Sequence, residues 1–203
     1  MKKWIAASLT LAAIVPAALR AQQHPPPPAT EPGATLLAIR TLPASSTSVL
    51  TITSPSFVAG GDIPFEYTQY KGNVFPGFAW NAGPTGTRSY VVIMQDADAL
   101  QNNAPILHWT MVNIPASVTT LDTALTTPPT GAMFGPNIRG EHQAYLGPRT
   151  PPGPKHRYHV QVFALDTVIP DAAVATYSGL VDAMKGHVLA SGELIGLGQA
   201  MDK

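Results

Sequence analysis

Proline and glycine occur throughout this chain at a density that few helical proteins tolerate. The 203 residues include 21 prolines and 17 glycines, and the stretch from 126 to 155 is rich in both. Proline removes a backbone donor and clashes inside a helix, so long helices are disfavoured over most of the chain. Apolar residues make up 45% of the sequence, enough for one packed core. We therefore expect a single, mainly β domain, a sandwich of sheets with long Pro/Gly-rich loops.

The first 21 residues have the pattern of a signal peptide. Basic residues stand at 2–3, an apolar stretch follows at 5–19, and Leu19-Arg20-Ala21 offers a cleavage site. This stretch is interrupted by Pro16 and is short for a membrane span of about 20 residues. We predict that residues 1–21 are removed and that the protein is exported, to be periplasmic or secreted.

Charge and cysteine content exclude several classes of protein. The 12 Lys and Arg balance 12 Asp and Glu, and losing the three basic residues of the leader leaves nine against twelve, a net charge of −3. Nucleic-acid binders usually carry a positive stripe, so no nucleic-acid partner is expected. The chain has no cysteine, which excludes a disulfide framework, a thiolate nucleophile and a cysteine zinc site.

A composition shift marks the start of the predicted domain. Residues 22–47 contain four successive prolines and little apolar surface, and a proline run favours extended polyproline II. We predict a disordered tether over 22–47 and a folded domain over 48–203.

Hydrophobic periodicity predicts the main elements of the domain. Ser178 offers an N-cap for one late helix, and Gly192 stands just beyond its end. The predicted strands cover 50–53, 90–94, 107–112, 156–165 and 193–197, and the helix covers 178–190.

Two of these strands carry polar side chains whose faces follow from period-two alternation. In the strand 107–112, Leu107, Trp109 and Met111 are expected on one face, and His108 falls on the other. In the strand 156–165, His156 and Tyr158 are the first two residues of the face that is otherwise apolar. The opposite face begins with Arg157 and His159.

Three segments carry side chains suited to a binding site. Asp96-Ala97-Asp98 follows a buried strand, where carboxylates serve either as loop caps or as site residues. His108 is either a hydrogen-bonded core histidine or a ligand-binding group. Between residues 139 and 157 there are four basic residues and a single acid; the basic ones are Arg139, Arg149, Lys155 and Arg157. This excess of positive charge either attracts an anion or belongs to a solvated basic loop.

Five motifs in this order resemble those of a known family. They are Ser54-Pro55-Ser56-Phe57 with Gly60-Gly61-Asp62-Ile63-Pro64 and Tyr67-Thr68, Asp96-Ala97-Asp98-Ala99-Leu100, His108-Trp109 through Pro115, Gly147-Pro148 through His156-Arg157-Tyr158, and Gly186-His187 through Glu193-Leu194. The pattern is similar to that of the phosphatidylethanolamine-binding proteins, in their bacterial, Raf-kinase-inhibitor-like branch. It covers roughly residues 49–199. Ala97 and Leu100 depart from it, since the family has prolines at both positions.

The resemblance implies a β-sandwich with a shallow pocket for a small anion, which we expect to be phosphate, a phospho-headgroup or a carboxylate. Carried over to this sequence, the ligand-binding residues are Asp96, His108, Gly147, Pro151, His156 and Tyr158. Asp98 is then a supporting residue behind the site, and Tyr145 flanks the proline loop. The resemblance implies neither a catalytic residue nor a metal or other cofactor.

Physical reasoning adds one condition to this pocket. An unpaired carboxylate repels phosphate, so Asp96 fits an anion site only if it holds a histidine. Accepting one imidazole N–H would orient the ring and favour its charged form, leaving the other N–H for the anion. We expect both His108 and His156 to be charged donors.

Other functions stay open on the sequence alone. Two histidines could act as acid and base on a phosphodiester, although no nucleophile motif is present. Asp96, Asp98, His108 and His156 could hold a metal ion. The resemblance also admits an inhibitor of an envelope protease, and neither a protein target nor a homodimer is excluded.

Overall fold

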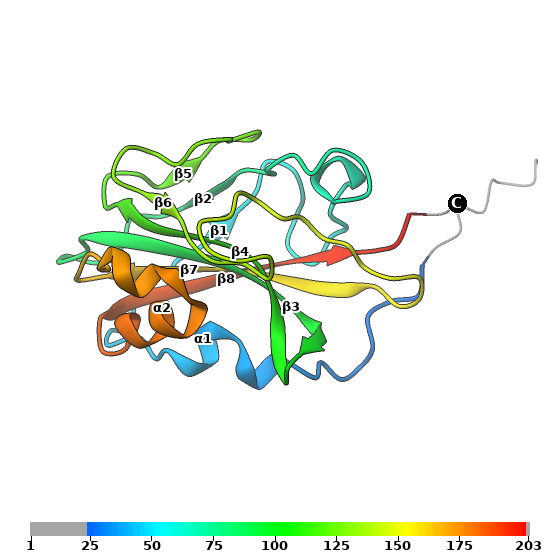
Figure 1. Cartoon of the computed structure of the whole chain (residues 1–203), viewed down its shortest axis with the longest axis horizontal. Coiled ribbons are helices and arrows are strands. Elements are labelled where there is room, and N and C mark those ends of the chain that lie inside the picture. The colour runs from blue at the N-terminus through cyan, green and yellow to red at the C-terminus, as the bar shows by residue number, and fades with distance from the viewer. Residues whose placement is uncertain (1–23, 202–203) are drawn as a thin grey trace, which may run out of the picture.

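Two antiparallel sheets and a few short helices make up the protein (Figure 1). The computed structural model describes residues 24–201, so the predicted signal peptide lies outside the described residues. The five-stranded sheet has the order β6 (Met133–Phe134), β4 (Ala104–Pro115), β3 (Ser89–Gln101), β7 (His156–Leu165) and β8 (Val188–Gly198). The three-stranded sheet has the order β1 (Ile52–Thr53), β2 (Phe78–Trp80) and β5 (Thr120–Leu121). The α-helices are α1 (Ala38–Thr41) and α2 (Tyr177–Met184), and the 3-10 turns are Ala34–Leu36, Phe65–Tyr67 and Asp171–Ala175.

The core has two layers, one on each face of the five-stranded sheet. Between the two sheets lie large aromatic and aliphatic side chains, among them Trp80, Trp109 and Val160. On the other face, the helices α1 and α2 cover residues such as Ile93 and Phe163 (Figure 1). Each element thus buries its apolar side against a neighbour, and the mainly β fold with a late helix is confirmed.

The strand β4 breaks the predicted alternation at His108. In the pairing of β3 with β4, Met94 faces Trp109 and Gln95 faces Leu107, so His108 is an extra residue in β4. Such a β-bulge turns the side chains on its two sides to different faces of the sheet. Trp109 packs between the sheets and Leu107 packs toward the helices. The prediction that these two share a face is therefore wrong.

The late helix is present but shorter than predicted. Thr176, rather than Ser178, caps it by accepting the N–H of Gly179 at 3.0 Å. The helix ends at Met184, and Gly186 takes φ +78°, a left-handed conformation that glycine adopts without strain. Val188, predicted to lie in the helix, opens β8. Between residues 24 and 201, no helix has the length and apolarity needed to cross a membrane.

Residues 24–42, here called the N-terminal strap, pack on the domain. The prediction of a disordered tether over 22–47 is wrong for this part, because Leu37, Ala38 and Leu42 are almost fully buried. The backbone N–H of Ala38 donates to Gln95 Oε1 at 3.1 Å, and that of Ile39 donates to Gln161 Oε1 at 2.7 Å. These apolar side chains follow the proline run and supply the buried surface that offsets the cost of ordering the strap.

Candidate functional site

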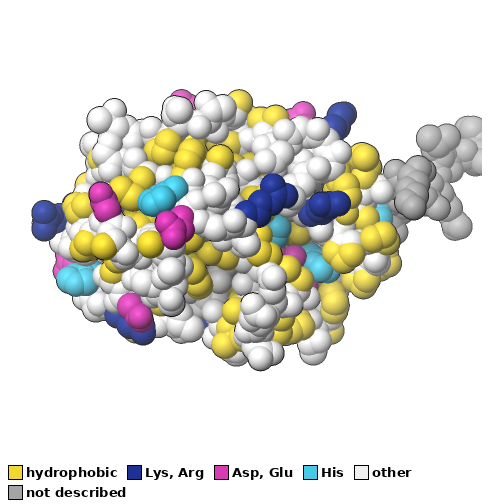
Figure 2. All heavy atoms as spheres, in the orientation of Figure 1, with side chains coloured by type: hydrophobic (Ala, Val, Ile, Leu, Met, Phe, Trp, Pro, Cys, Tyr) yellow, Lys and Arg dark blue, Asp and Glu magenta, His cyan; other side chains and the backbone are white. Residues whose placement is uncertain are grey.

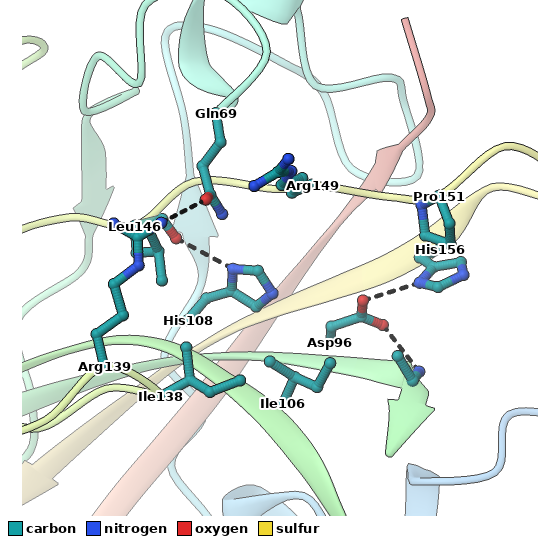
Figure 3. Close-up of a pocket in the computed structure, with 11 residues that line it drawn as sticks. Gln69, Asp96, Ile106, His108, Ile138, Arg139, Leu146, Arg149, Pro151 and His156 are labelled. Atoms are coloured by element: carbon teal, nitrogen blue, oxygen red, sulfur yellow. Dashed lines mark hydrogen bonds and ion pairs between the residues drawn. The ribbon is translucent and has the colours of Figure 1, made fainter. Parts of the chain in front are cut away.

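A cavity of about 360 Å³ opens beside the bulge of β4 (Figure 3). Its walls come from β3, β4, the start of β7 and the loops before them. Among the predicted residues, Asp96, His108, Pro151 and His156 line it. The other lining residues are Gln69, Ala99, Ile106, Ile138, Arg139, Leu146 and Arg149.

His156 and Asp96 form a largely buried ion pair at this cavity. The antiparallel pairing of β3 with β7 places Asp96 opposite Tyr158, two positions from His156. The Nδ1–H of His156 donates to Asp96 Oδ2 at 2.8 Å, and the two side chains are only 14% and 3% exposed. The hydrogen bond that His156 donates to Asp96 raises the pKa of His156, and this outweighs the opposite effect of burial. The imidazole is therefore stabilised in its charged form.

The second oxygen of Asp96 is also satisfied. Oδ1 accepts the backbone N–H groups of Asp98 at 3.0 Å and Ala99 at 3.2 Å. The carboxylate therefore shapes the irregular stretch of β3 after residue 96 and holds His156. Its negative charge is compensated locally, which meets the condition set above for an anion site.

His108 differs from His156 in both its partners and its charge. Its Nδ1 lies 3.1 Å from the carbonyl oxygens of both Leu146 and Gly147. The residue is only 5% exposed, and burial lowers its pKa despite the attraction of Asp96. The surroundings therefore favour the charged form of His156 and the neutral form of His108, whereas we expected both rings to be charged.

Gly147 positions the loop that carries these carbonyls. A Cβ atom here would collide with the carbonyl oxygen of Tyr67, so only glycine fits this close approach. Its N–H donates to Asn73 Oδ1 at 2.8 Å, and its carbonyl also accepts from Gln69 Nε2 at 2.7 Å. Gly147 thus anchors His108 through its backbone rather than lining the cavity.

Tyr158 lies behind His108 rather than in the cavity wall. Its side chain is fully buried, and its ring packs edge-on against the His108 ring at 5.0 Å between centroids. The hydroxyl contacts Thr150 Oγ1 at 3.0 Å and accepts the N–H of Arg149 at 3.3 Å. Burial and the nearby Asp96 raise the pKa of Tyr158. The tyrosine therefore stays protonated and positions both the loop and His108.

Asp98 and Tyr145 also lie outside the cavity. Asp98 accepts the backbone N–H and the Nε of Arg157 at 2.7 and 2.8 Å. Burial opposes ionisation of Asp98, but the hydrogen bonds and charge of Arg157 outweigh it and lower its pKa. Tyr145 donates its hydroxyl to the carbonyl of Tyr67 at 3.0 Å and is buried between the sheets. Among residues 24–201 no three acidic or histidine side chains form a group that could hold a metal ion, so the four residues considered for a metal do not make one.

Two arginines stand at the cavity, as the basic segment of the sequence indicated. Arg139 donates to Gln69 Oε1 at 3.0 Å, and Arg149 follows the anchored Gly147 in the loop. Figure 2 shows basic side chains along the edge of a hollow in which histidine and acidic groups are visible. Sequence reasoning missed Gln69, Ile106 and Ile138, which carry no motif and come from three separate segments.

This arrangement can hold an anion beside an apolar surface. His156 and the two arginines supply positive charge, while Ile106, Ile138 and Leu146 supply an apolar wall. The lining residues among 24–201 include no hydroxyl or thiol side chain, so no Ser, Thr, Tyr or Cys nucleophile lines the cavity.

Comparisons with known proteins agree with this architecture. The family model described as phosphatidylethanolamine-binding protein matches residues 53–199. A UPF0098 protein of Methanothermobacter thermautotrophicus is 34% identical over 141 residues, covering 68% of this chain and 90% of its own length. The crystal structure of CT736, a phosphatidylethanolamine-binding protein homologue from Chlamydia trachomatis, is similar with a TM-score of 0.67 and 29% identity, covering 77% of this chain and 99% of that one. The crystal structure of YbcL of Escherichia coli gives a TM-score of 0.67 with 28% identity, covering 76% of this chain and 100% of that one.

Proposed function

The chain belongs to the phosphatidylethanolamine-binding protein family, and from this premise we propose that it is an exported binding protein for a small anion. The ligand class comprises phosphate, the phosphoryl groups of small phospho-compounds and similar anions. The cavity of about 360 Å³ is large enough for such a group with a short apolar substituent.

The His156–Asp96 pair carries this proposal. One ring nitrogen of His156 is committed to Asp96 at 2.8 Å, which favours the charged imidazolium. A charged ring has a second N–H to donate, and hydrogen bonds to an ionised partner are among the stronger ones in proteins. Because Arg139 and Arg149 stand at the same cavity, the site combines three cationic groups with one compensated carboxylate.

Calorimetric titration with inorganic phosphate at pH 6 tests this function. Replacing His156→Ala should weaken phosphate binding by roughly ten- to a hundred-fold, since a hydrogen bond to a charged group contributes about 1.5–3 kcal/mol. His187→Ala is the matched control, because His187 also pairs with an aspartate, Asp166, at 2.8 Å but on the exposed surface. Equal affinities for the wild type and His156→Ala would overturn the proposal.

Export rests on the N-terminal sequence. Cleavage after Ala21 would leave the whole strap on the mature protein, since the strap begins at residue 24. Intact-mass measurement of secreted or periplasmic material should give a chain that starts at or near Gln22. A mature chain that retains residues 1–21 would contradict export by this route.

A further inference from the structure

The hydrogen bonds of His108 fix where its proton lies. Its Nδ1 faces two backbone carbonyl oxygens, Leu146 O and Gly147 O, each at 3.1 Å. A carbonyl oxygen can only accept, so Nδ1 must carry the proton in either charge state of the ring. If the ring is neutral, the other nitrogen, Nε2, has a lone pair and can only accept.

The surroundings of His108 favour this neutral ring. The residue is 5% exposed, and its burial lowers its pKa. From β3 it faces Asp96, which attracts a proton; from β7 it faces the edge of Tyr158 and the charged His156, which repels one. The cavity wall adds Arg139 and Arg149.

The acceptor Nε2 is directed into the cavity without a protein partner. Figure 3 shows this nitrogen on the side of the ring away from Leu146, toward the part of the pocket where Asp96 lies. Within the described chain, residues 24–201, no hydrogen bond reaches it. Among the described residues, the fully buried side-chain polar atoms without a partner are those of Trp80 and Trp109, so His108 Nε2 is reachable from the cavity. A bound ligand that cannot donate would leave this acceptor unpaired, so a ligand that donates to it gains relative to one that cannot.

We infer that this pocket selects anions that carry their own proton, so that a P–OH group donates to His108 Nε2 while the remaining oxygens accept from His156 and the arginines. The inference rests on the proposed anion binding and narrows its ligand class. Hydrogen phosphate and phosphomonoesters have such a proton. Sulfates and phosphodiesters do not, so each would place an acceptor or an alkyl group against the lone pair of His108.

Methyl phosphate and methyl sulfate form a matched pair of probes. They have similar shapes, and at pH 5 both carry one negative charge, because the second pKa of a phosphomonoester is about 6. They then differ mainly in the single hydroxyl. A site built around a hydrogen-bonded hydroxyl strongly rejects the analogue that lacks it. Calorimetry at pH 5 should show methyl phosphate binding at least about tenfold more tightly than methyl sulfate.

Dimethyl phosphate separates free phosphoryl groups from lipid-type phosphodiesters. It has one negative charge and no hydroxyl, as a diester headgroup has, and it should bind as weakly as methyl sulfate. Equal or tighter binding of either hydroxyl-free probe would overturn the selectivity while leaving anion binding intact. If none of the three probes binds, the proposed function itself fails.

Two further measurements assign the selectivity to His108. In His108→Ala the ratio of the affinities for methyl phosphate and methyl sulfate should fall toward one, because the acceptor is gone. An unchanged ratio would overturn the assignment. Since this variant also removes the anchor of the loop at Gly147, nitrogen-15 NMR of the wild-type protein gives an independent test. Nε2 of His108 should take up a proton only at a lower pH than an ordinary histidine does, and an Nε2 that is protonated at pH 7 would contradict the inference.

Discussion

The two faces of strand β7 carry the same kinds of side chain but satisfy them differently. On the cavity face, His156 bonds one carboxylate, Asp96, through one ring nitrogen. On the opposite face, His159 lies between two carboxylates: Nδ1 bonds Glu193 Oε1 at 2.9 Å, and Nε2 bonds Glu31 of the strap. The number of partners at each ring nitrogen therefore distinguishes the two histidines: one nitrogen of His156 has a partner, and both nitrogens of His159 do.

The strap face is a closed network. Arg157 bonds Asp98 and also donates to the carbonyls of Pro28 and Thr30 at 3.0 and 3.2 Å. Burial opposes the charging of His159, but its hydrogen bonds and attraction to Glu193 and Glu31 outweigh this and raise its pKa. Each charged group here has partners from the protein, so we interpret this face as structural.

The cavity face leaves acceptors and donors open. Among the described residues, the second nitrogens of His108 and His156 have no hydrogen-bond partner. This contrast between the faces supports our proposal that a ligand binds at the cavity face. The following predictions test this division.

Removing the strap should have the largest effect on stability. A chain that begins at Ser48 lacks Leu37, Ala38 and Leu42, which are buried against the sheet. Full burial of one large apolar side chain contributes about 1.5–3 kcal/mol, partly offset by the entropy of ordering the strap. We expect urea unfolding to show a loss of about 3–5 kcal/mol, with phosphate affinity changed less than about threefold. Unfolding that is unchanged would show that the strap contributes nothing to stability.

His159→Ala should also reduce stability without affecting phosphate binding. The substitution leaves Glu31 and Glu193 facing each other without the ring between them. Breaking a buried ion pair by removing one partner costs about 3 kcal/mol. Chemical denaturation measures this loss, and His187→Ala, at an exposed pair, serves as the control. A phosphate affinity that fell as far as in His156→Ala would mean that the two faces are not separate.

Asp96→Asn should weaken phosphate binding by about tenfold, or about 1.4 kcal/mol, although it removes a negative charge. His156 would lose the partner that raises its pKa and would be less charged near neutral pH. Calorimetry at pH 7 measures the change, with Asp166→Asn, at the exposed pair with His187, as the control. Tighter binding to Asp96→Asn would contradict the role of this aspartate.

The pairing of His159 with Glu31 of the strap should make the stability of the protein depend on pH. We expect this effect to be smaller than those of the substitutions above. The folded pKa of His159 is raised above its unfolded value of about 6.5. Its contribution is therefore complete below the unfolded pKa and is lost as pH rises through the folded pKa. We expect the stability advantage of the wild type over His159→Gln to shrink as the pH rises from 6 to 9. Urea midpoints across this range measure it, and an advantage that grows with pH would contradict the sign.

Local patterns in the sequence predicted more of the fold than of the contacts around the site. Alternation placed the strand at 156–165 and put His156 and His159 on opposite faces, as the structure has them. The bulge at His108 was not predictable, because it depends on the partner strand β3 rather than on β4 alone. The strap was missed because its proline run suggested disorder. Its buried residues Leu37, Ala38 and Leu42 are recognisable as a packing surface only against the sheet.

The residues of the cavity, too, were predictable where a local motif contains them and unpredictable where they come from distant segments. Motif residues such as Asp96 and His156 follow from the sequence, and so does the condition that the aspartate must hold a histidine. Gln69 and Ile106 reach the cavity from segments that no local pattern connects. Whether a histidine is charged depends on its burial and partners, so the difference between His108 and His156 required the structure.

A nitrogen-15 NMR titration of the histidine side chains tests the division between the two faces most directly. On addition of methyl phosphate at pH 5, the signals of His108 Nε2 and His156 Nε2 should shift, because these nitrogens contact the ligand. The signals of His159 should stay in place, because both of its nitrogens already bond carboxylates. Shifts at His159 together with unmoved signals at His108 and His156 would contradict the account.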